Sequence, residues 1–147
     1  MKTTPEVQAQ ILLIDDSRDG LLVRTALLED MGCTVEMANN GEEGLKLFKA
    51  GRFDVVVTDY RMPGMNGLEL IRKIRQMDPQ ARIVLLSKMV EPLGLNEDNT
   101  GADAVIAKSC HEGSLLPRTV KRLLNRPVRK PVRSQNRLTT KTAAVMR

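Results

Sequence analysis

Hydrophobic residues gather in four short continuous runs, and each run is followed at once by a polar residue or ends on one. Runs of this length, rich in Val and Ile and separated by helical stretches, predict strands of a parallel sheet buried on both faces. A fifth segment, Thr34–Ala38, alternates as an edge strand does when one side is wetter. The four runs are Ile11–Ile14, Val55–Thr58, Ile83–Leu86 and Ala104–Ala107.

The segments between these strands carry apolar residues at helical spacing. A first helix is predicted over Arg18–Met31 and is stopped by Gly32, and a second begins near Gly41 and ends at Gly51. A third is predicted over Leu68–Met77. Strands that alternate with helices through right-handed crossovers predict an α/β fold with a five-stranded, doubly wound parallel sheet.

The next segment, Lys88–Thr100, interrupts this rhythm. It contains Pro92 and Gly94 and has few well-spaced apolar residues. Inside a helix, Gly and Pro cost about 1 and 3 kcal/mol relative to Ala. A fourth helix is therefore expected to be weak or shortened.

The last helix has an ambiguous start. Ser109 and Glu112 form a candidate capping box, but a helix that starts there carries Pro117 well inside it. Ser114 as the N-cap puts Pro117 in the first turn, where its missing N–H matters less. We expect the later start.

Charge divides the chain into parts. All 18 acidic residues precede Arg126, whereas the last 22 residues hold seven basic side chains and no acidic one. We therefore predict an N-terminal extension over 1–8, one domain over 9–125 and a basic, proline-containing, disordered tail over 126–147. The tail could contact nucleic acid or an anionic surface weakly and non-specifically, but it has no aromatic residue to stack on bases.

Some protein classes are disfavoured by composition. No apolar run reaches the length of a membrane span, and the N-terminal residues show no hydrophobic signal region. The two cysteines, Cys33 and Cys110, are too far apart in sequence to suggest a metal or disulfide framework. We expect a cytoplasmic protein.

Candidate chemistry lies where the predicted strands end. Asp15, Asp16, Asp59, Ser87 and Lys108 all stand at the carboxyl ends of strands, which meet at one edge of a parallel sheet. Three carboxylates at one edge repel each other, and a divalent cation removes that conflict. Mg²⁺ prefers oxygen ligands and commonly uses one or two carboxylates together with a phosphate. Simple capping of helix N-termini is the alternative use of three such aspartates.

The same residues suit phosphoryl chemistry. A carboxylate such as Asp59 is a competent nucleophile toward a phosphoryl group. Lys108 can neutralise one phosphoryl oxygen, and the Ser87 hydroxyl can form a hydrogen bond with another.

The nonamer Asp-Tyr-Arg-Met-Pro-Gly-Met-Asn-Gly at 59–67, with Asp15-Asp16 before it and Ser87 and Lys108 after it, resembles the receiver domain of two-component response regulators. The resemblance covers roughly residues 9–125. It implies a flavodoxin-like sheet with strand order 2-1-3-4-5. It also implies Mg²⁺ as the cofactor, held by Asp15, Asp16, Asp59 and the backbone carbonyl of Arg61.

By this resemblance Asp59 is the phosphoacceptor, with Ser87 and Lys108 assisting. The donor is a sensor histidine kinase or a phosphotransfer protein. The resemblance implies a stand-alone receiver that signals through protein contacts, as a monomer or homodimer, and is no enzyme beyond its own phosphotransfer and dephosphorylation. It does not name the downstream target.

Three positions depart from the family pattern. Val105 stands where an aromatic switch residue is usual, and Ser109 stands where a proline, often on a cis bond, is usual. A cis bond before serine costs about 2.5–4 kcal/mol, so we expect trans. Lys88 replaces a small residue and is expected to charge the entrance of the site.

Two alternatives stay open. The departures at Val105 and Ser109 are compatible with a degenerate receiver that acts as a phosphorylation-independent scaffold. A phosphatase of the haloacid dehalogenase type also uses strand-end Asp, Ser and Lys, but it requires a second Asp two residues after the first, where this chain has Ser17.

Overall fold

The computed structural model describes residues 8–109 and 111–126, which build one sheet of five parallel strands in the order β2-β1-β3-β4-β5. This order and the flavodoxin-like fold confirm the prediction. The expected extension over 1–8 and the tail over 126–147 fall almost wholly outside the described residues. The strands are β1 (Gln10–Ile14), β2 (Thr34–Ala38), β3 (Val55–Asp59), β4 (Ile83–Ser87) and β5 (Ala104–Ala107).

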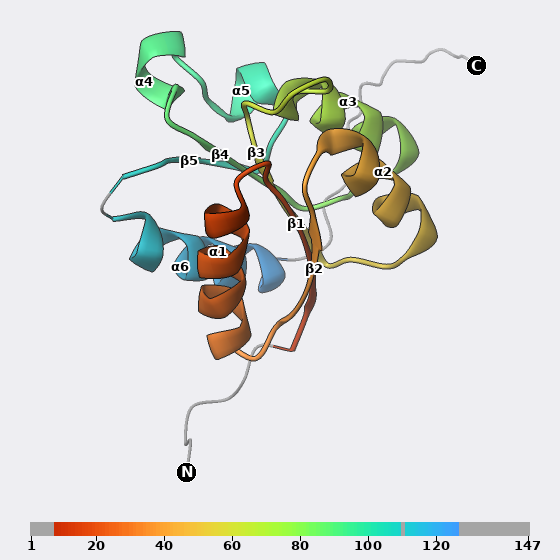
Figure 1. The fold of residues 1–147 in the computed structure, drawn as a ribbon, viewed down its shortest axis with the longest axis vertical. Coiled ribbons are helices and arrows are strands. Elements are labelled where there is room, and N and C mark those ends of the chain that lie inside the picture. The colour runs from red at the N-terminus through yellow and green to blue at the C-terminus, as the bar shows by residue number, and fades with distance from the viewer. Residues whose placement is uncertain (1–7, 110, 127–147) are drawn as a thin grey trace, which may run out of the picture.

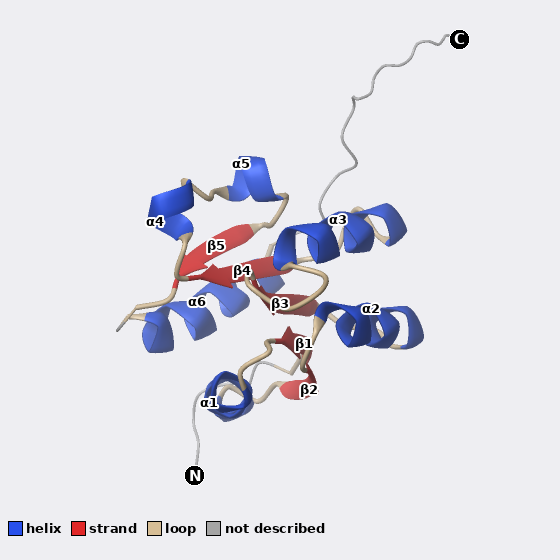
Figure 2. Ribbon diagram, turned by 45° about the horizontal axis from the view of Figure 1, so that its top comes forward, coloured by secondary structure: helices blue, strands red, loops and turns tan. Residues whose placement is uncertain are grey.

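Helices cover both faces of the sheet, with α1 and α6 on one side and α2 and α3 on the other (Figures 1 and 2). Strand residues alternate between the two cores. In β1, Ile11 and Leu13 face the core beneath α1 and α6, whereas Leu12 and Ile14 face the core beneath α2 and α3. Burial of both faces explains the continuous apolar runs in β1, β3 and β4.

The first three helices follow the predicted bounds to within a residue: α1 (Arg18–Asp30), α2 (Gly41–Ala50) and α3 (Gly67–Met77). Each begins after a side chain that accepts a hydrogen bond from a backbone N–H of its first turn. These N-caps are Ser17, Asn40 and Asn66. Each of these helices follows the carboxyl end of a strand in the chain.

The segment after β4 forms two four-residue helices, α4 (Val90–Leu93) and α5 (Glu97–Thr100), in place of one longer helix. The expected weakness of this region is confirmed, but its division in two was not foreseen. Gly94, with φ of 62°, ends the first turn, and Asn96 and Asn99 form a reciprocal capping box that starts the second.

The last helix, α6, spans Glu112–Leu124, so the predicted start at Ser114 is wrong. Ser109 does not cap the helix either, because its hydroxyl accepts from the N–H of His111 at 3.2 Å. The early start has a tertiary cause. Arg24 of α1 forms an ion pair with Glu112 and holds the first turn of α6, although Pro117 then lies inside the helix.

No helix in the described ranges, 8–109 and 111–126, is long and apolar enough to cross a membrane.

Candidate functional site

The carboxyl edge of the sheet brings three aspartates together. Asp15 and Asp16 follow β1, and Asp59 ends β3 beside it. One carboxylate oxygen from each of the three lies within 4.8 Å of the others. Asp15 and Asp59 are buried and Asp16 is exposed, so the cluster opens to solvent on one side.

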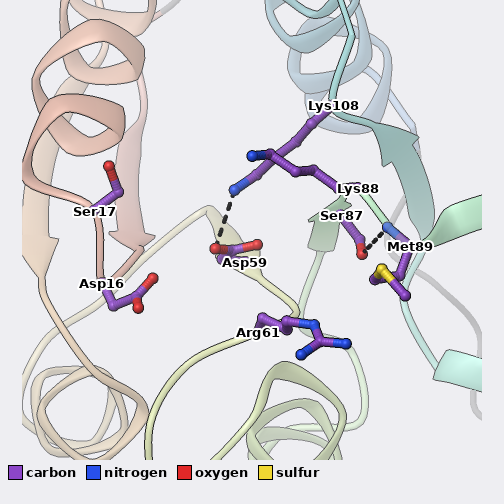
Figure 3. A pocket seen from close by; sticks show the side chains of 8 residues that line it. All are labelled: Asp16, Ser17, Asp59, Arg61, Ser87, Lys88, Met89 and Lys108. Atoms are coloured by element: carbon purple, nitrogen blue, oxygen red, sulfur yellow. Dashed lines mark hydrogen bonds and ion pairs between the residues drawn. The ribbon is translucent and has the colours of Figure 1, made fainter.

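Asp59 is fixed by contacts to both of its carboxylate oxygens. Oδ2 lies 3.0 Å from the Nζ of Lys108 (Figure 3). Oδ1 accepts the backbone N–H of Tyr60 at 2.8 Å. The Lys108 amine also lies 3.9 Å from Oδ2 of Asp15. One cation therefore stands between two of the three acids.

Burial sets the acidity of this carboxyl group. Loss of solvation raises the pKa of Asp59 above its ordinary value, and the charge of Asp15 adds to this. The Lys108 amine and the Tyr60 N–H act in the opposite direction without cancelling the rise. A cation at the cluster would favour the ionised, nucleophilic form of Asp59.

Ser87 ends β4 next to Asp59, and the residue is 1% exposed. Its hydroxyl oxygen accepts the backbone N–H of Met89 at 2.8 Å. Because that bond uses the oxygen as an acceptor, the hydroxyl proton remains available to a ligand. The N–H of Lys108 donates to the Ser87 carbonyl at 2.9 Å, which ties the lysine-bearing end of β5 to β4.

A cavity of about 300 Å³ opens above these groups. Figure 3 shows the Lys88 side chain lying at the same end of the cavity as Lys108, while Arg61 lies on the opposite side. The expectation that Lys88 charges the entrance agrees with this placement. The lining residues are Asp16, Ser17, Asp59, Arg61, Ser87, Lys88, Met89 and Lys108.

The loop after Asp59 is closed by Gly67. The N–H of Gly67 donates to the Tyr60 carbonyl at 2.8 Å. A Cβ at this position would collide with the Asp59 carbonyl and would lie 2.9 Å from the Cα of Tyr60. Glycine is therefore required for the helix start to sit this close to the Asp59 and Tyr60 backbone.

The donor set fits Mg²⁺. It consists of hard carboxylate oxygens, one side of it opens to a cavity large enough for water and a phosphoryl group, and Mg²⁺ prefers such a partly hydrated site.

Sequence reasoning missed Arg24, which is buried beside the cluster. It forms ion pairs with Asp15 on one side and Glu112 on the other. The signal was available, because Arg24 stands between Leu21 and Leu28 on the buried stripe of α1, where a charge needs a partner.

The structure also shows the surroundings of Val105 and Ser109, two of the three positions that depart from the family pattern. Val105 is only partly buried against the core beneath α2 and α3. The described residues contain no cis peptide bond, which agrees with the trans bond expected before Ser109.

Comparison with known proteins identifies the family. The model of the response regulator receiver domain matches residues 11–119. The chain belongs to this family. Among curated relatives, a response regulator receiver protein of Anaeromyxobacter sp. (strain Fw109-5) is 40% identical over 79 residues, which cover 54% of this chain and 33% of that protein.

Two solved structures place this receiver domain in context. The response regulator TrrA of Thermotoga maritima, solved with Mg²⁺ and beryllofluoride, is 33% identical with a TM-score of 0.69, covering 78% of this chain and 97% of that one. TrrA in its complex with the histidine kinase ThkA is 34% identical with a TM-score of 0.70 and the same coverage.

The chain is thus a response regulator receiver domain. It spans a third or less of the length of the first curated relatives that it matches.

Proposed function

We propose that Asp59 accepts a phosphoryl group in a Mg²⁺-dependent transfer and that the resulting charge is read by a protein partner. The observation that carries this proposal is the 3.0 Å contact between Lys108 and Asp59 within a cluster whose three carboxylates lie within 4.8 Å. An acceptor, a cation for its product and a set of metal ligands thus share one cavity.

Asp15, Asp16, Asp59 and the Arg61 carbonyl would hold the metal, which supplies positive charge to the phosphoryl oxygens. An Asp59 oxygen forms a bond to phosphorus as the bond from phosphorus to the donor nitrogen breaks, and the donor keeps that electron pair. Lys108 then exchanges the carboxylate for a phosphoryl oxygen, and the Ser87 hydroxyl donates to another. Groups preorganised in this way stabilise the charge on the transferring group.

The proposed donor is a sensor histidine kinase or a phosphotransfer protein. The similarity to TrrA, which has been solved in complex with a histidine kinase, supports this choice. The proposal keeps the cytoplasmic location expected from the sequence. Contact of the tail with nucleic acid or an anionic surface, and a homodimer, stay predictions.

The reaction is proposed to be stoichiometric and self-catalysed, unlike that of a phosphatase. Membership of the receiver family argues against the haloacid dehalogenase alternative. Ser17, which stands where that class requires its second Asp, is the N-cap of α1. The alternative of a phosphorylation-independent scaffold is favoured by Val105 and Ser109, which depart from the family pattern. A scaffold would bind its partners equally well with or without a modifiable Asp59.

Incubation with acetyl phosphate and Mg²⁺, followed by intact mass measurement, tests the proposal. The parent chain is expected to gain one acid-labile phosphate, and Asp59→Asn none. The matched control is Asp54→Asn, an exposed aspartate just before the same strand, at the opposite edge of the sheet. Equal phosphate on the parent and on Asp59→Asn would refute the assignment.

A further inference from the structure

An arginine lies buried between the metal site and the first turn of α6. Arg24 is 8% exposed and shares the inner stripe of α1 with Leu21 and Leu28. Arginine is seldom buried unless it is paired, because its charge loses solvation. Its partners therefore explain its position.

The guanidinium joins two carboxylates that are far apart in sequence. Nη1 donates to Oδ2 of Asp15, Nε donates to Oε2 of Glu112, and Nη2 donates to Oε1 of Glu112 at 3.3 Å. Asp15 belongs to the metal cluster, and Glu112 is the first residue of α6. The planar guanidinium presents its donors in fixed directions to both carboxylates, whereas a lysine would offer only a point charge at the end of a flexible stem.

Gly20 makes room for this contact. A Cβ at Gly20 would lie 2.7 Å from Oδ2 of Asp15 and 2.5 Å from Nη1 of Arg24. The helix backbone thus passes close to the ion pair only because position 20 has no side chain. The arrangement is built into three separate elements of the chain: α1, the end of β1 and the start of α6.

A metal ion must share Asp15 with this arginine. Oδ1 of Asp15 accepts the N–H of Ser17 at 2.9 Å, and Oδ2 faces both Arg24 and Lys108. Both oxygens are engaged, and positive charge already neutralises the carboxylate. A cation that approaches Asp15 therefore meets repulsion from a fixed, buried positive charge.

We propose that Arg24 is a positioning residue that lowers the Mg²⁺ affinity of the acidic cluster and links the cluster to α6 through Glu112. The inference deepens the proposed metal site and rests on it. When Mg²⁺ binds Asp15, the ion pair between Arg24 and Asp15 weakens. The ion pair between Arg24 and Glu112 then strengthens and stabilises the first turn of α6. Because coupling between two sites is reciprocal, weakening the Glu112 contact must in turn weaken Mg²⁺ binding.

Calorimetric titration of the whole chain with Mg²⁺ tests the proposal, because two substitutions should act in opposite directions. Arg24→Met removes the competing charge and is expected to tighten Mg²⁺ binding by about fivefold or more. In Glu112→Gln, Arg24 keeps Asp15 as its only charged partner, so this variant is expected to bind Mg²⁺ more weakly by about the same factor. A purely structural bridge would change the affinity in neither direction, or in the same direction for both.

Each variant has a control with the same change in net charge. Arg75→Met removes an arginine that binds Asp103 and the Gly101 carbonyl, near the opposite edge of the sheet. Asp19→Asn removes an exposed acid from the first turn of α1. Both controls are expected to bind Mg²⁺ as the parent does.

Amide exchange supplies a second readout. Addition of Mg²⁺ is expected to slow exchange at Ser114 and Leu115, whose N–H groups donate to the His111 carbonyl. Arg24→Met and Arg24→Lys should both lose this response, since neither side chain bridges the two carboxylates. If Arg24→Met fails to fold, Glu112→Gln and Arg24→Lys carry the test.

The failures are distinguishable. If the parent binds no Mg²⁺, both the proposed metal site and the proposed role of Arg24 are refuted. If the parent binds Mg²⁺ but Arg24→Met and Glu112→Gln match their controls, the metal site stands and the role of Arg24 is overturned.

Discussion

At the scale of single residues, the proposed acceptor site is a balance between burial and charge. Asp59 is 6% exposed and close to Asp15, which disfavours its charged form, while Lys108 restores part of the loss. Such sites keep a carboxylate reactive at the expense of folding stability. The balance can be measured from the dependence of stability on pH.

Asp59→Asn is expected to be more stable than the parent at neutral pH in Mg²⁺-free buffer. Because the pKa of Asp59 is raised in the folded state, the folded chain holds more protons than the unfolded chain between the two pKa values. Stability contributed by the protonated form is therefore lost as pH rises through the folded pKa. The asparagine variant avoids that loss.

Urea unfolding followed by circular dichroism gives the measurement, because the chain contains no tryptophan. The advantage of Asp59→Asn should shrink as the pH is lowered through the range where the carboxyl group protonates. Glu36→Gln, an exposed residue of β2, removes one negative charge as a control. A variant no more stable than the parent at neutral pH would show that Lys108 compensates the burial fully.

The residues that sequence patterns could reveal are those that end strands. Asp15, Asp59, Ser87 and Lys108 were placed at one edge because apolar runs locate strand ends and parallel strands share a direction. Arg24 was missed because the helical pattern counted only apolar residues. Its partner Glu112 is 88 residues away, and pairing over such a distance leaves no local signal.

At the scale of elements, local sequence rules worked where local forces dominate. The N-caps and the glycine stops fixed α1, α2 and α3, because capping bonds form within one turn. The start of α6 was wrong because a tertiary ion pair to Glu112 outweighs the preference of Pro117 for the first turn. Tertiary contacts overrule local preferences of this size.

Pro117→Ala is expected to raise the free energy of unfolding by about 1–3 kcal/mol. Pro117 lies inside α6, where it lacks the N–H that an alanine would donate to the carbonyl four residues back. The measurement is chemical unfolding of the two proteins at one pH. Pro79→Ala, in the turn before β4, should give no gain, and a Pro117→Ala variant no more stable than the parent would contradict the helical strain inferred here.

At the scale of the whole molecule, one edge of the sheet collects contributions from the entire chain. Acids at the ends of β1 and β3, a hydroxyl at the end of β4 and an amine just after β5 meet only in the folded state. A ligand that binds this assembly binds the folded state alone. Metal binding should therefore stabilise the fold as a whole.

Mg²⁺ at ten times its dissociation constant is expected to raise the free energy of unfolding by about 1.4 kcal/mol. Asp16→Asn should lose most of this gain, because Asp16 is an exposed member of the cluster whose removal leaves the core intact. Thermal or urea unfolding with and without Mg²⁺ measures the difference. An equal gain in the parent and in Asp16→Asn would mean that the ion binds elsewhere.

Chemical trapping of the phosphorylated residue tests the central claim most directly. The chain is incubated with acetyl phosphate, with Mg²⁺ or with a chelator, then reduced with borohydride, which converts an acyl phosphate of aspartate to homoserine, and mapped by peptide mass spectrometry. We predict homoserine at position 59 alone, and only with Mg²⁺. Homoserine at Asp15 or Asp16 instead, or at position 59 to the same extent without Mg²⁺, would contradict the account.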